Sequence, residues 1–70
     1  MTPAARVQAA IDILSNIART HAPADRVVDG WARSSRFAGS KDRAAVSELV
    51  YATLRHRAEL AHAVKTTEPR

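Results

Sequence analysis

The sequence predicts an all-α fold, a small bundle of three helices over residues 3–20, 23–35 and 41–65. In each segment apolar residues recur at steps of three and four, the spacing of one face of an α-helix. Residues that start or stop helices, among them Pro3, Pro23 and Gly39, separate the segments. Seventy residues suffice for one small domain, which we place at residues 1–65, followed by a polar tail or linker at residues 66–70.

The first helix begins at a capping signal. The hydroxyl of Thr2 can accept a hydrogen bond from a free amide of the first turn, and Pro3 suits the first helical position because the N–H that it lacks has no partner there. Apolar residues then form one stripe, which we expect to face the core: Val7, Ile11, Leu14 and either Ile17 or Ala18.

The second helix restarts at Pro23 and carries Asp25 in its first turn, where a negative charge complements the helix dipole. Gly30 costs about 1 kcal/mol relative to alanine inside a helix. A close-packed neighbour or a tolerated defect explains this glycine equally well. Asp25 and Asp29 lie one turn apart, but Asp29 also precedes Arg33 by four residues, so an exposed ion pair within the helix is expected in place of a carboxylate catalytic site.

A connection around Phe37 leads into the third helix. We expect Gly39 in the left-handed position after a helix, Ser40 as the next N-cap and Asp42 in the first turn. Arg57 interrupts the apolar stripe of the third helix, which predicts that this helix leaves the core there. The stripe consists of Val46, Leu49, Val50, Thr53, Leu54, Leu60, Ala61 and Val64.

Several classes of function lack their residues here. The chain has no cysteine, hence neither a disulfide nor a thiol ligand for zinc, and only two glycines, too few for a nucleotide-binding loop. His56 and His62 are six residues apart on the expected helix and cannot bind one metal from the same face. We therefore expect no enzymatic activity, no cofactor and no metal. Without a long apolar run, the chain is expected to be cytoplasmic, with no membrane segment.

The positive charge is concentrated in one part of the sequence. The stretch from Arg33 to Arg57 holds six basic and two acidic residues, which accounts for the whole formal charge of +4. Ser40 and its basic neighbours lie at a helix N-terminus, a position that favours phosphate, although Arg43 can instead pair with Asp42 or Glu48. Solvated helix faces are the alternative explanation. The candidate RNA-binding residues are Arg33, Arg36, Lys41, Arg43, Arg55 and Arg57, with Ser40 as a phosphate ligand.

Residues 36–55 resemble the N-terminal helical domain of the Fmu/Sun (RsmB) ribosomal RNA cytosine methyltransferase family. The motif residues are Asp42-Arg43-Ala44, Glu48-Leu49, Tyr51 and Leu54-Arg55, and the openings Pro3-Ala4-Ala5-Arg6 and Pro23-Ala24-Asp25-Arg26-Val27 fit as well. The resemblance implies an NusB-like RNA-binding fold that precedes an S-adenosylmethionine-dependent catalytic domain. The catalytic cysteines of that family are absent here, and Ser47 stands where a basic residue is common.

The sequence thus predicts a non-catalytic RNA-binding module that helps to position a ribosomal RNA methyltransferase on structured RNA. Its expected partners are structured, ribosomal RNA and a methyltransferase catalytic domain. The alternative is a protein-protein interaction or oligomerisation module with a basic solvated surface. Since so short a chain has little core and no disulfide or metal to support it, we also expect the isolated chain to form a homo-oligomer.

Overall fold

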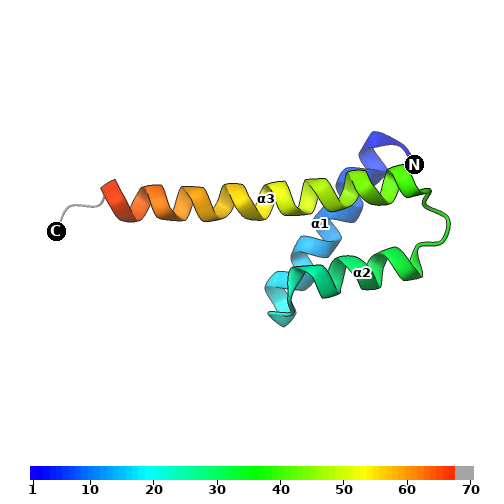
Figure 1. Ribbon diagram of the computed structural model, residues 1–70, viewed down its shortest axis with the longest axis horizontal. Helices are drawn as coiled ribbons and strands as arrows, with labels where there is room; N and C mark the ends of the chain where they lie inside the picture. The colour runs from blue at the N-terminus through cyan, green and yellow to red at the C-terminus, as the bar shows by residue number, and fades with distance from the viewer. Residues whose placement is uncertain (68–70) are drawn as a thin grey trace.

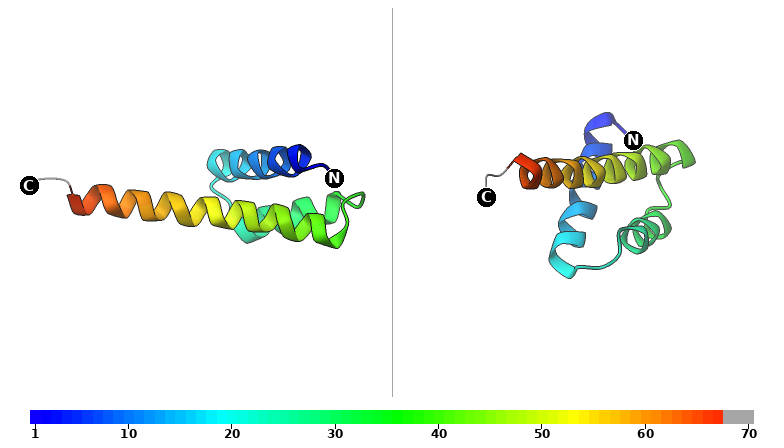
Figure 2. Two further views of the ribbon diagram at one scale, coloured as in Figure 1. Left: turned by 90° about the horizontal axis from the view of Figure 1, so that it is seen from above. Right: turned by 60° about the vertical axis from the view of Figure 1, so that its left-hand side comes forward.

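The computed structural model describes residues 1–67 and confirms the all-α fold. Helix α1 spans Pro3–Thr20, α2 spans Ala24–Ser34 and α3 spans Ser40–Thr67 (Figure 1). Helices α1 and α2 pack beside the N-terminal half of α3, and the C-terminal half of α3 extends beyond them (Figures 1 and 2). None of the described helices is long and apolar enough to span a lipid bilayer.

The two ends of α1 are fixed by local hydrogen bonds. As predicted, Thr2 is the N-cap, and its hydroxyl accepts a hydrogen bond from the amide of Ala5 at 3.1 Å. The helix ends at His21, which has a left-handed backbone (φ 58°) and donates its N–H to the carbonyl of Ile17 at 2.9 Å. The prediction of a left-handed Gly39 after the second helix is wrong, because neither glycine has a positive φ.

The core differs from the predicted one in the face that α1 buries. Val7 and Ile11 are 49% and 48% exposed, whereas the small residues Ala9 and Ala10 are buried. The centre of the buried face is turned by roughly 100° about the axis of α1 relative to the stripe of large apolar residues. Alanines at a contact allow two helices to approach closely. The buried cluster comprises Ala9, Ala10, Ile13, Val28, Val46 and Val50, with Leu14, Ile17, Val27, Trp31 and Leu54 packed against it.

Helix α2 lies one residue inside its predicted bounds at each end, with Pro23 at the N-cap and Ser35 at the C-cap. A Cβ atom built on Gly30 meets no atom within 4 Å, so no close-packed neighbour accounts for this glycine. The expected ion pair between Asp29 and Arg33 is not formed, because the ion pairs of residues 1–67 are all made by Asp42. Exposed pairs of this kind contribute only about 0.3–0.5 kcal/mol, too little to hold the flexible arginine in one position.

The connection between α2 and α3 is a turn whose ends are anchored. The N–H of Ser35 donates to the carbonyl of Trp31 at 2.9 Å, and the N–H of Ala38 donates to the carbonyl of Ser35 at 3.0 Å. The carbonyl of Gly39 accepts from the N–H of Arg43 at 3.0 Å, which places Gly39 rather than Ser40 at the N-cap position of α3. The prediction for Ser40 is wrong by one residue, because the turn at residues 35–38 already reverses the chain.

Helix α3 leaves the core close to Arg57, as the interrupted apolar stripe predicted. Leu54 is the last residue packed against the core, and every residue from Arg55 to Lys65 is exposed. We call residues 55–67 the arm. Two residues of the predicted tail, 66 and 67, belong to α3, and residues 68–70 lie outside the described residues. Leu60 and Val64 on the arm are 52% and 64% exposed.

Because of the arm, the chain is less compact than a globular domain of its size. Its radius of gyration is 14.2 Å, against about 11 Å for a compact domain of 70 residues. Its accessible surface is 5401 Å², against roughly 4,300 Å² for a folded monomer of 7.6 kDa. The excess of about 1,100 Å² is polar and apolar surface together, and it includes the exposed Leu60 and Val64 of the arm.

Candidate nucleic-acid interface

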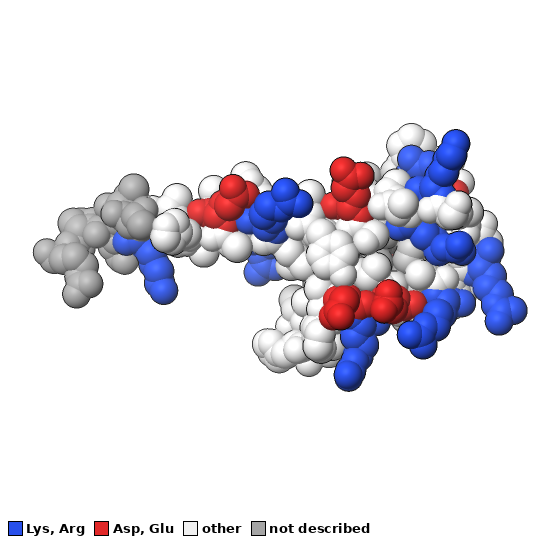
Figure 3. Space-filling view, in the orientation of Figure 1, with Lys and Arg blue, Asp and Glu red and all other residues white. Residues whose placement is uncertain are grey.

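Basic side chains gather at the end of the molecule where α2 leads into α3 (Figure 3). Arg33 belongs to the last turn of α2, Arg36 to the connection and Lys41 to the first turn of α3, and all three are exposed. We call these three residues the basic end. Within residues 1–67 none of them forms an ion pair with an acidic side chain.

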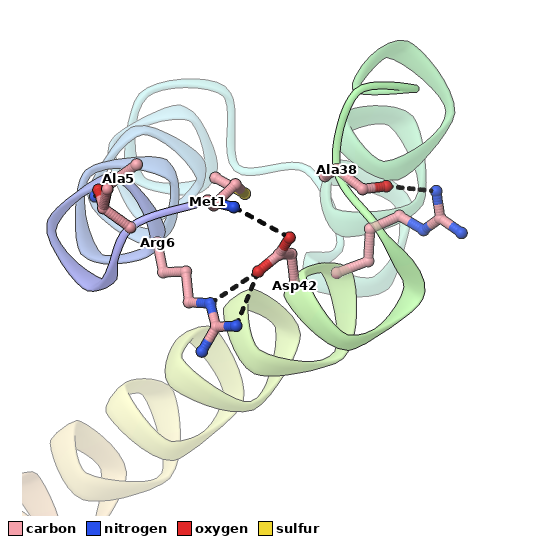
Figure 4. A network of polar contacts seen from close by, with 7 residues as sticks. Met1, Ala5, Arg6, Ala38 and Asp42 are labelled. Carbon is pink, nitrogen blue, oxygen red and sulfur yellow. Dashed lines mark hydrogen bonds and ion pairs between the residues drawn. The ribbon is translucent and has the colours of Figure 1, made fainter.

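Acidic residues lie on both sides of the basic end. On α2, Asp25 and Asp29 line a shallow groove together with Arg33, without an ion pair to it among residues 1–67. On α3, the charge of Asp42 is compensated by Arg6 and the amino terminus. Its Oδ1 atom accepts from Arg6 Nε at 2.9 Å and lies 2.7 Å from Arg6 Nη2, while its Oδ2 atom lies 3.2 Å from the amino group of Met1 (Figure 4). The hydrogen bond from Arg6, followed by that from the amino terminus, holds the pKa of Asp42 below its ordinary value of 3.8. Asp42 therefore stays ionised and joins α1 to α3, and it does not cancel the charge of the basic end.

Arg43 differs from the other predicted RNA-binding residues. Its side chain is half-buried, and Nη1 donates a hydrogen bond to the carbonyl of Ala38 at 3.0 Å (Figure 4). The pairing of Arg43 with Asp42 or Glu48, which was the alternative to ligand binding, is not formed among the described residues. Arg43 thus fixes the connection to α3, and only the rest of its guanidinium is available to a ligand.

The structure does not bring all predicted site residues together. Ser40 is exposed at the start of α3 and lies beside the basic end. Arg55 and Arg57 lie on the arm, several turns further along α3. Since two residues rotate by roughly 200° around a helix, these two arginines face different sides. They do not form one surface with the basic end.

Phe37 is a residue of this region whose exposure the sequence did not reveal. It lies in the connection next to Arg36, and it is 79% exposed, more than any other large apolar residue described. Its neighbours Ser35 and Ala38 are 5% and 2% exposed. An aromatic residue between basic residues is a recognised signal for nucleic-acid contact, and it was available in the segment Arg36-Phe37.

The rest of the described surface has shallow, open grooves. An open groove between α1 and α3 is lined mainly by apolar residues, including Val7, Ala45 and Leu49. Another between α1 and α2 passes Gly30 and Trp31. Among residues 1–67, no group of three or more histidine, cysteine, aspartate or glutamate residues is placed to hold a metal ion.

No protein-family model, no curated protein and no solved structure matches this chain. The resemblance of residues 36–55 to the Fmu/Sun family therefore stays a prediction from the motif residues. Arg6, from the opening of the first helix, binds Asp42, from residues 36–55, so these two parts of the sequence meet in the fold.

Proposed function

We propose that this chain is a non-catalytic RNA-binding module that holds the phosphates of structured RNA at its basic end. The observation that carries the proposal is that Arg33, Arg36 and Lys41 are exposed and form no ion pair with an acidic side chain among residues 1–67. They flank the connection between α2 and α3, and the negative charge of Asp42 nearby is compensated by its ion pairs with Arg6 and the amino terminus. Each cation placed on a phosphate releases counterions, which favours binding without any contact to a base.

Phosphate contacts position a protein on RNA but carry little sequence information. The module should therefore bind structured RNAs with little discrimination of sequence. A double-stranded RNA presents its phosphates at regular spacing, and a protein recognises it mainly by shape. Weak, salt-sensitive binding is the expected behaviour of so small a patch.

The motif residues support a more specific role, that of an accessory domain for a ribosomal RNA methyltransferase. Asp42, Arg43 and Leu54 belong to the segment that resembles the Fmu/Sun family. In this fold Asp42 and Arg43 hold α3 in place beside α1 and the connection, and Leu54 packs against the core. The motif thus supports the arrangement that presents the basic end, and the exposed cations contact RNA.

Charge reversal tests the proposal. The variant Arg36→Glu/Lys41→Glu should weaken binding to a structured ribosomal RNA fragment and reduce the slope of log affinity against log salt by about 1.5 to 2, the loss of two phosphate contacts. The matched control is Arg19→Glu/Lys65→Glu, which makes the same change in net charge at the end of α1 and on the arm. It should retain most of the affinity. Equal affinity of the first variant and the unmodified chain would refute the proposal.

A second candidate function, a protein-protein interaction module, is supported by the exposed apolar surface. Val7 and Ile11 on α1 and Leu60 and Val64 on the arm are each about half exposed or more. The total surface exceeds that of a compact monomer by about 1,100 Å², polar and apolar together, while one partner buries roughly 800 Å² in a standard interface. A second copy of this chain supplies such cover most simply, in a two-fold dimer.

The two functions respond differently to salt. RNA affinity should fall steeply between about 50 mM and 200 mM salt, whereas an apolar interface should hardly respond. Sedimentation and RNA binding measured over the same salt series therefore separate them. Both can hold for one chain, since the basic end and the apolar residues of α1 and the arm are different surfaces.

A further inference from the structure

Phe37 is exposed in a way that the local structure enforces. At 79% exposure its ring makes little contact with the rest of the protein, although seven smaller apolar residues are buried in the part of the chain that the structure describes. An exposed phenylalanine leaves a large apolar area in water, which binding to a partner would remove. The question is which partner suits its surroundings.

The segment that carries Phe37 is ordered by hydrogen bonds on both sides. Before it, Ser35 is buried and its N–H donates to Trp31 at 2.9 Å. After it, Ala38 is buried, donates its N–H to the carbonyl of Ser35, and accepts from Arg43 Nη1 at 3.0 Å. The turn is therefore anchored at both ends, and it holds the ring outward at a defined place (Figure 4 shows the contact between Ala38 and the arginine).

The charge around Phe37 restricts the partner. Arg36 precedes it directly and Lys41 follows four residues later, both exposed and without an acidic partner among residues 1–67. A purely apolar protein surface would bury these cations without compensation, which is costly. A nucleotide offers a flat face for the ring and an anionic phosphate for the cations.

We propose that Phe37 stacks on an unpaired base of RNA while Arg36 and Lys41 contact the phosphates beside that base. This inference rests on the proposed function and names its substrate class: RNA with an accessible unpaired nucleotide, such as a hairpin loop or a bulge. Bases within a continuous A-form duplex are stacked on each other and offer no free face to the ring. Stacking of this kind tolerates any base, so it adds affinity for loops without adding sequence specificity.

The experiment compares two RNAs of equal length, a hairpin with an unpaired loop and a continuous duplex, in fluorescence titrations with the 70-residue chain. Phe37→Ala should reduce affinity for the hairpin about ten-fold, within the range measured when one stacking aromatic is replaced by alanine, and leave duplex affinity within about two-fold. Phe37→Tyr should retain the preference for the hairpin, because it keeps the ring. Leu60→Ala, which removes an exposed apolar side chain from the arm, is the control and should change neither affinity.

A 2-aminopurine base in the loop reports stacking directly. Its fluorescence should fall on binding to the unmodified chain and much less on binding to Phe37→Ala. If Phe37→Ala binds both RNAs as the unmodified chain does, while Arg36→Glu/Lys41→Glu weakens both, the stacking inference is wrong and the proposed function stands. If the charge-reversed variant also binds unchanged, the proposed function fails, and the stacking inference fails with it.

Discussion

Replacing Gly30 by alanine should stabilise this protein. Gly30 lies in the interior of α2, is exposed, has no positive φ, and leaves open space where a Cβ atom would be. The added methyl group therefore meets no clash, and the unfolded chain loses conformational freedom. The expected gain is about 0.5–1 kcal/mol. For a chain of this length, that gain corresponds to a rise in melting temperature of about 2–8 °C.

Thermal unfolding followed by circular dichroism at 222 nm measures this change. Gly39→Ala is the matched control, because the same atoms are added outside a helix interior. A Cβ there makes an ordinary contact, 3.9 Å from Asp42 Oδ2, but alanine is a poorer N-cap than glycine, so this variant should gain nothing. A Gly30→Ala variant that melts at or below the temperature of the unmodified chain would refute the reasoning, and would indicate that something occupies the groove beside Trp31 in solution.

Three further predictions concern the core, the ion pair and the arm. Val46→Ala removes a side chain that is 0% exposed and should cost about 2–3 kcal/mol in urea unfolding, while Val64→Ala on the arm should change stability by less than about 0.5 kcal/mol. Because the pKa of Asp42 is lowered in the folded state, its contribution to stability is present above 3.8 and is lost as the pH falls through the folded value. Asp42→Asn should therefore reduce the acid dependence of stability in unfolding curves at a series of pH values, and an unchanged dependence would contradict this assignment. If the exposed apolar surface pairs two copies, the melting temperature should rise with protein concentration, and Leu60→Glu should abolish the rise; a concentration-independent melt with a monomer in sedimentation would exclude self-association.

The sequence by itself determined the three helices and most of their ends. Residues 3–20 were predicted and observed for α1, and the other ends differ by at most two residues. Helix periodicity and the start signals at Thr2 and Pro23 are local, so they can be recognised without knowledge of the packing. The departure of α3 from the core near Arg57 was also predictable, because a charged residue interrupts the apolar stripe there.

The basic end was partly predictable from the sequence, because it also depends on local features. Arg33, Arg36 and Lys41 come together because they are close in sequence, across one connection. Arg55 and Arg57 lie far from these three residues, because α3 continues as one straight helix. The tertiary structure shows this continuity. The ordered turn that presents Phe37 depends on the buried Ser35 and Ala38, and the sequence gives no sign of their burial.

Only the tertiary structure decided which face of α1 is buried and which residue neutralises Asp42. Hydrophobicity favours Val7 and Ile11, but the buried residues are Ala9 and Ala10, because the fit between helix surfaces depends on side-chain size as well as polarity. Arg6 and Asp42 are 36 residues apart in the sequence, and their contact exists only after α1 has packed against α3. The periodicity of a sequence identifies an apolar face, whereas the partner on that face is fixed by the relative placement of helices that are distant along the chain.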